Sequence, residues 1–171
     1  MEDCLNSQFD KMIPELVDFI TKGKTPEGEI VKPLSMLVER NALNLTQQFT
    51  RFLEFSVPDL SQVDSSQLEY IFVFAAIWSF GSIIQNYEKD RFNKVVKELC
   101  TIVPPGESLF DGYYDTQEKS YLLWDNLLTS YQPPKDGSFS KILVPTTDTV
   151  KYTYLLQLFL SQGSPFILVG D

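Results

Sequence analysis

The chain has 171 residues, of which 43% are hydrophobic and 13% aromatic, so it can bury a sizeable core and is not a disordered segment. Its net charge of −9 argues against direct binding to nucleic acid or to an anionic membrane. With no histidine and only two widely spaced cysteines, Cys4 and Cys100, a zinc site and a histidine-based catalytic triad are excluded. The acidic start lacks an apolar stretch, so we expect no signal peptide and a reducing intracellular compartment.

Apolar side chains at helical spacing predict a first helix over residues 7–22, with Pro14 as a kink or restart and Gly23 as the stop. A polar loop should follow, after which Pro33 opens a short helix through Val38. Another helix is expected to begin near Asn44.

Residues 70–84 carry no charge and form the most hydrophobic stretch, which begins near Asp64. A membrane span needs about 20 apolar residues, and this run is shorter and closely bracketed by Glu69 and Glu88. The pattern therefore predicts a buried core helix. Gly81 would allow a neighbouring backbone to approach closely.

The next segments read as a helix followed by short strands. Helical spacing at residues 92–100 predicts the helix, and residues 109–115 resemble a strand of the family named below, in which Gly112 would make a bulge. Asp111 and Asp115 could be imagined as paired catalytic carboxylates, but they have no histidine, glycine-rich loop or metal-type companion. We therefore expect both carboxylates to be structural.

The C-terminal stretch combines an extended segment, a helix and a strand. Residues 142–145 read as extended, and hydroxyls at 146–149 should cap a helix that continues through Phe159. Residues 166–169 read as a buried strand followed by Gly170, which is how a phosphate-binding loop begins. The lysine of such a loop would fall about five residues beyond the last residue of this chain.

Two stretches carry a family resemblance. Residues 72–81, FVFAAIWSFG, resemble a Phe-Val-Phe-x-x-Ile-Trp-Ser-x-Gly helix in the lid of dynein heavy chains. Residues 144–152, VPTTDTVKY, with FILVG at 166–170, resemble the Val-Pro-Thr-x-Asp-Thr-Val-Arg segment and strand before the Walker A loop of their third AAA+ module. Lys151 stands where arginine is usual, which keeps the charge and loses the planar fork.

The resemblance implies a mainly α fold, with the helical lid of the second AAA+ module over residues 1–108 and short strands and loops over 109–140. Residues 141–171 would be the truncated beginning of an α/β P-loop large subdomain. The implied parent is the ATP-dependent, minus-end-directed microtubule motor of cilia and flagella, with the axonemal branch the closer match. The implied location is the cytoplasm or cytoskeleton, in the axoneme of a cilium or flagellum.

The resemblance also implies a nucleotide-binding role for a few residues. Val144, Pro145 and Thr146 would lie against adenine, and Gly170 would be the first glycine of the phosphate loop. The parent family uses ATP or ADP with Mg, but no cofactor is expected for this chain alone, because hydrolysis also needs a Walker A lysine and a Walker B acid. The implied partners are the rest of the motor ring, dynein intermediate and light chains, and microtubules.

Two interpretations remain open: a piece of a motor protein, or a stand-alone helical interaction module derived from an AAA+ lid. If residues 166–169 formed a core-type strand without partner strands, the exposed strand would be an aggregation hazard. This favours a motor-protein piece that is not catalytically competent alone.

Overall fold

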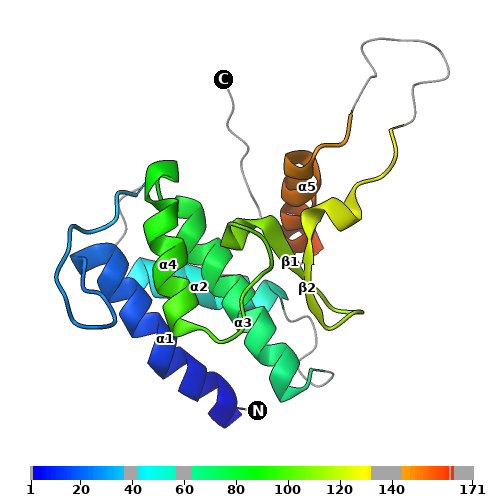
Figure 1. The fold of residues 1–171 in the computed structure, drawn as a ribbon. Helices are drawn as coiled ribbons and strands as arrows, with labels where there is room; N and C mark the ends of the chain where they lie inside the picture. The colour runs from blue at the N-terminus through cyan, green and yellow to red at the C-terminus, as the bar shows by residue number, and fades with distance from the viewer. Residues whose placement is uncertain (1, 37–41, 57–62, 132–143, 162, 164–171) are drawn as a thin grey trace. The chain divides into compact units, whose positions relative to one another are not determined.

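The computed structural model describes residues 2–36, 42–56, 63–131, 144–161 and 163. The chain divides into a first unit that ends at Leu122 and a second unit that begins at Leu123. The helices and strands that it contains, coloured along the chain in Figure 1, are α1 (Glu2–Lys22), α2 (Ala42–Ser56), α3 (Ser65–Phe80), α4 (Lys89–Leu99), β1 (Gly112–Asp115), β2 (Ser120–Leu123) and α5 (Thr147–Ser161), with short 3-10 turns η2 (Gly81–Ile83), η3 (Asn86–Glu88), η4 (Leu109–Asp111) and η5 (Trp124–Leu127).

Helix α3 is the centre of the first unit. It packs against α1 and α2, and also against η4 and β1, and every residue from 71 to 81 is buried. A helix that is buried on all sides needs apolar side chains on all sides, which explains the uncharged run in the sequence. Within the described residues, no helix is both long enough and apolar enough to cross a membrane.

Aromatic rings fill the space between α2 and α3. The Phe49 ring is fully buried and lies 4.9 Å from the Phe72 ring and 5.7 Å from the Phe80 ring, measured between centroids. A second set of aromatic contacts joins α3 to the two-stranded sheet formed by β1 and β2, where the Tyr121 hydroxyl donates to the Tyr70 carbonyl oxygen at 2.6 Å. These contacts tie α2, α3 and β2 into one core.

The ends of the helices follow local sequence signals. Asp64 caps α3 by accepting a hydrogen bond from the Gln67 backbone N–H, while the Gln67 side chain accepts from the Asp64 backbone N–H. Helix α1 ends at Gly23, where φ is +71° and a Cβ would lie 1.9 Å from the Val31 carbonyl oxygen. The helix start near Asp64 and the Gly23 stop were both predicted, and only glycine fits the latter position.

Helix α1 begins earlier than predicted, at Glu2, and continues through Pro14. A proline inside a helix removes one backbone hydrogen bond, here the bond to the carbonyl of Asp10. Asp10 and Pro14 are both exposed, so water can satisfy that carbonyl. The solvent-facing position explains why the helix does not restart.

The prediction of a helix from Pro33 is wrong for residues 33–36, the part of that segment that the structure describes. The Leu34 N–H donates to the Ile20 carbonyl oxygen, and the Ser35 carbonyl oxygen accepts from Gln85 N–H at 2.9 Å. Met36 then forms an isolated β-bridge with Ile84. These long-range bonds hold the backbone extended, so tertiary contacts override the local helix signal; residues 37 and 38 lie outside the described residues.

Gly81 and Gly112 both occupy crowded positions. A Cβ on Gly81 would lie 2.4 Å from Cζ of Phe110, so the close neighbour is an aromatic ring and not the backbone that was predicted. Gly112 has an extended conformation as the first residue of β1, where a Cβ would lie 3.0 Å from Cβ of Pro104. Gly112 therefore has a packing role at the start of β1.

Candidate functional site

The first turn of α5 is fixed by a reciprocal pair of threonines. The Thr146 hydroxyl accepts from the Thr149 backbone N–H at 3.2 Å, and the Thr149 hydroxyl accepts from the Thr146 backbone N–H at 2.8 Å. The predicted hydroxyl cap is therefore confirmed. This arrangement satisfies backbone groups that a helix start leaves without partners, and it fixes the position of Pro145, the residue before Thr146.

Two contacts hold η5 against α5. The Thr147 hydroxyl donates to Asp125 Oδ1 at 2.8 Å, and the Trp124 ring packs edge-on against the Tyr154 ring with centroids 5.4 Å apart. Trp124 is almost fully buried. The chain that follows η5 therefore runs beside the first turns of the helix.

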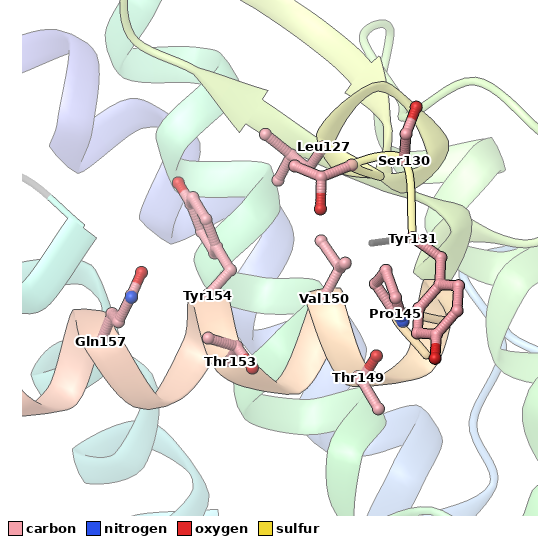
Figure 2. A pocket seen from close by; sticks show the side chains of 10 residues that line it. Leu127, Ser130, Tyr131, Pro145, Thr149, Val150, Thr153, Tyr154 and Gln157 are labelled. Atoms are coloured by element: carbon pink, nitrogen blue, oxygen red, sulfur yellow. The ribbon is translucent and has the colours of Figure 1, made fainter. Parts of the chain in front are cut away.

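A cavity of about 680 Å³ lies between this chain and the helix. Figure 2 shows its two walls, with side chains from α5 projecting toward those of residues 127–131. We call it the α5 cavity, and it is lined by Leu127, Thr129, Ser130, Tyr131, Pro145, Thr149, Val150, Thr153, Tyr154 and Gln157. Its volume lies in the range of about 300–1,000 Å³ that is usual for small-molecule sites.

The α5 cavity is lined by neutral side chains. Among the described residues that line it, none is charged, whereas hydroxyls and the Gln157 amide supply hydrogen-bonding groups. A neutral ligand with polar edges suits such walls, but a phosphate group would find no cation there. Lys151 instead pairs with Asp148, with Nζ 2.6 Å from Oδ1, and its ammonium lies 5.3 Å from the centre of the Tyr152 ring.

Of the four residues that the resemblance singled out, the structure describes three, and only Pro145 lines the α5 cavity. Pro145 lines the α5 cavity, but Val144 is 52% exposed and outside the lining, and Thr146 is exposed and caps the helix. Gly170 and the strand predicted at residues 166–169 lie outside the described residues. The adenine contacts of these residues stay a prediction.

The sequence reading missed most of the α5 cavity. Thr149, Thr153 and Gln157 recur every four residues, as do Val150 and Tyr154, so this spacing on α5 was a usable signal for one shared face. Residues 127–131 contain no motif and come from a separate part of the chain, so nothing in the sequence placed them opposite α5.

Other titratable groups in the structure have structural explanations. The Asp111 carboxylate accepts from Ser108 N–H at 2.8 Å, and the Asp115 carboxylate accepts from the Gln117 and Glu118 N–H groups. Burial raises the pKa of the Cys100 thiol to about 12, so little reactive thiolate is present at neutral pH. The described part of the chain contains no cluster of metal-ligating side chains.

Two family models match successive parts of the chain. The model described as "Dynein heavy chain AAA lid domain" matches residues 5–126, and the model described as "P-loop containing dynein motor region" matches residues 131–171. The first match contains α2, α3, α4 and all of α1 except its first three residues, and the second contains α5. The fold is therefore mainly α, with a helical AAA lid followed by the start of a P-loop domain, as the resemblance implied.

Curated relatives agree with this assignment. The chain is 34% identical to the Dynein-1-alpha heavy chain of the flagellar inner arm I1 complex from Chlamydomonas reinhardtii, over 99% of this chain and 4% of that protein. It is 27% identical to human Dynein axonemal heavy chain 10, over 98% of this chain and 4% of the relative. It is 28% identical to Dynein axonemal heavy chain 5 from Rattus norvegicus, over 99% of this chain and 5% of the relative.

The chain thus spans only about one twenty-fifth to one twentieth of the length of these curated relatives. The alignments nevertheless cover 98–99% of this chain, and the first family model alone covers more than half of it. The relatives named above are flagellar or axonemal heavy chains. On this evidence, the chain belongs to the dynein heavy chain family.

Proposed function

We propose that this chain supplies the lid of the second AAA+ module and the adenine-side segment of the third in the motor ring of an axonemal dynein. The parent would be the ATP-dependent, minus-end-directed motor that moves along microtubules in cilia and flagella. Its partners would be the rest of the ring, dynein intermediate and light chains, and microtubules. The first unit would act as a structural lid, and the start of the second unit as one side of a nucleotide site.

The observation that carries the nucleotide part of this proposal is the position of Pro145. The cap of α5 fixes Pro145 in the wall of the uncharged cavity, next to the exposed Val144 and Thr146. Apolar and backbone contacts are sufficient to hold a base, and neutral walls leave the phosphates to bind elsewhere. Val144, Pro145 and Thr146 would therefore contact adenine, and Gly170 would begin the loop that holds the phosphates.

ATP or ADP with Mg would be the cofactor of the parent motor. Stable nucleotide binding depends on charge-assisted bonds to phosphate, and hydrolysis needs a lysine, a Ser/Thr and an acid around Mg²⁺. We therefore expect that this chain by itself binds nucleotide weakly and does not hydrolyse it.

Photoaffinity labelling tests the adenine contact. The full chain is irradiated with 2-azido-ATP at increasing concentration, digested, and mapped by mass spectrometry. We expect label in the peptide that contains Val144, Pro145 and Thr146, its suppression by excess ATP, and phosphate release no faster than in buffer. Label confined to peptides of the first unit, or label that excess ATP does not suppress, would contradict the proposal.

A further inference from the structure

One wall of the α5 cavity comes mostly from residues that neither family match includes. Residues 127–130 lie after the lid match, which ends at 126, and before the motor-region match, which begins at 131. Leu127, Thr129 and Ser130 nevertheless line the cavity together with Tyr131. The stretch between the two matched regions therefore contributes side chains to the same space as Pro145.

Tyr131 is the aromatic side chain of this wall. Figure 2 shows its ring at the end of the cavity where Pro145 and Thr149 lie. Tyr131 is 40% exposed, so its ring can meet a ligand without breaking core packing. By contrast, the Tyr154 ring is already packed edge-on against Trp124.

The chemistry of the two walls selects a class of ligand. An aromatic ring and a proline ring offer apolar surfaces to a base, and purine bases stack on aromatic side chains. Thr129, Ser130 and Thr153 add neutral hydrogen-bonding groups. Within the described lining there is no charge that would attract a phosphate or an ammonium group.

We propose that residues 127–131 form the second wall of a nucleoside site, and that Tyr131 stacks on the base held against Pro145. This rests on the proposed function, which assigns adenine to the Pro145 side of the cavity. It adds a positioning residue, Tyr131, where the joining stretch meets the first residue of the motor-region match. A ligand in this site would contact that stretch directly.

Adenosine is the probe that tests base binding at this wall, because it carries the base and ribose without the phosphates. The full chain, labelled with 15N, is titrated with adenosine and followed by amide chemical shifts. We expect saturable shifts at Thr129, Ser130 and Tyr131 as well as at Val144 and Thr146. Tyr131→Ala should raise the Kd about tenfold or more, and Tyr131→Phe, which keeps the ring, should leave it within about twofold.

Tyr152→Ala is the matched control. Tyr152 is also a tyrosine and is 57% exposed, but it lies outside the cavity lining, so its removal should leave the Kd unchanged. A retained amide spectrum in each variant shows that the fold is intact. An equal loss of affinity in Tyr131→Ala and Tyr152→Ala would overturn the role of Tyr131.

The remaining outcomes separate this inference from the proposed function. Saturable shifts at Val144 and Thr146 that Tyr131→Ala leaves unaltered would overturn the second wall and leave the adenine proposal standing. Shifts confined to residues 127–131 and α5 would support the wall and contradict an adenine role for Val144 and Thr146. No saturable shift in either place, or shifts elsewhere only, would overturn both.

Discussion

Helices α3 and α5 are both rich in apolar residues, yet they are buried to very different degrees. Every residue of α3 from 71 to 80 is buried, whereas α5 has one buried residue, Leu155, and exposes 57% of Tyr152 and 60% of Leu160. The two helices have nearly the same length, 16 and 15 residues. The difference shows that apolar content alone does not determine how much of a helix is buried.

The two helices are consequently held in place by different forces. Helix α3 is surrounded by α1, α2, η4 and β1, so hydrophobic burial dominates its stability. Helix α5 relies on its threonine cap, the Thr147–Asp125 hydrogen bond and the Trp124–Tyr154 contact. Because caps and single hydrogen bonds contribute about 1 kcal/mol each, we expect the first unit to resist denaturant more strongly than the second.

The largest expected effect comes from Phe49→Ala in the first unit. The ring is fully buried and contacts the Phe72 and Phe80 rings, so its removal leaves a cavity. We expect the free energy of unfolding of the first unit to fall by about 3–5 kcal/mol in urea titrations followed by circular dichroism. The control Leu160→Ala, at an exposed site on α5, should change it by less than about 0.5 kcal/mol; equal effects would refute the contrast between the units.

Gly81→Ala should produce the next largest effect. The added methyl would lie 2.4 Å from Phe110 Cζ and 2.9 Å from Phe92 Cε1, so two buried rings must shift. Such overpacking typically costs about 1–3 kcal/mol. Gly81 itself has an ordinary helical conformation, with φ of −71°, so the cost is steric and not a backbone effect.

A double-mutant cycle with Phe110→Leu checks this explanation. The smaller side chain opens space near residue 81, so Gly81→Ala should cost much less in that background than in the wild type. If the two substitutions are simply additive, the Phe110 contact is not the source of the cost.

Glu88 should make the stability of the first unit depend on pH. Burial by itself would raise the pKa of Glu88, but the hydrogen bond and charge of Arg91, together with Ser35, outweigh it and hold the pKa below the ordinary value of 4.5. The ionised carboxylate therefore stabilises the fold above about pH 4.5, and this contribution is lost as the pH falls through the folded-state pKa.

Glu88→Gln measures that contribution while keeping the size of the side chain. At pH 7 the substitution should lower the free energy of unfolding by on the order of 1 kcal/mol, because a charged hydrogen bond becomes a neutral one. The difference from wild type should shrink toward zero near pH 3. A difference that stays constant between pH 7 and pH 3 would rule out the ionised Glu88–Arg91 pair as its source.

Local sequence signals predicted the first unit well where the hydrophobic pattern and the start of a helix indicate the same element. The uncharged run around Phe72 predicted a buried core helix that starts near Asp64, and the structure confirms both the burial and the start of α3. Pro33 misled the prediction because hydrogen bonds to Ile20 and Gln85, which are distant in sequence, hold that segment extended. Propensity describes only near neighbours, so such tertiary bonds cannot be read from it.

The candidate site was predicted only in part, for the same reason. Of the residues predicted to contact adenine, only Pro145 lines the α5 cavity, whereas Thr129 and Tyr131 carry no motif and face α5 only in the folded chain. A wall made by residues distant in sequence depends on the fold that brings them together.

Removal of residues 135–171 is the largest change to the chain, yet we expect it to have the smallest effect on the stability of the first unit. The side chains that form its aromatic core, including Phe49, Phe72 and Tyr121, all precede Leu123, where the second unit begins. The chain truncated after Pro134 should therefore keep the helical circular-dichroism signal of α1 to α4 and unfold within about 0.5 kcal/mol of the first unit in the full chain. Phe49→Ala should cost the same in both forms, because independent sites contribute additively. Loss of the helical signal on truncation would mean that the first unit depends on the second, and the contrast between α3 and α5 could no longer be explained by burial within the first unit alone.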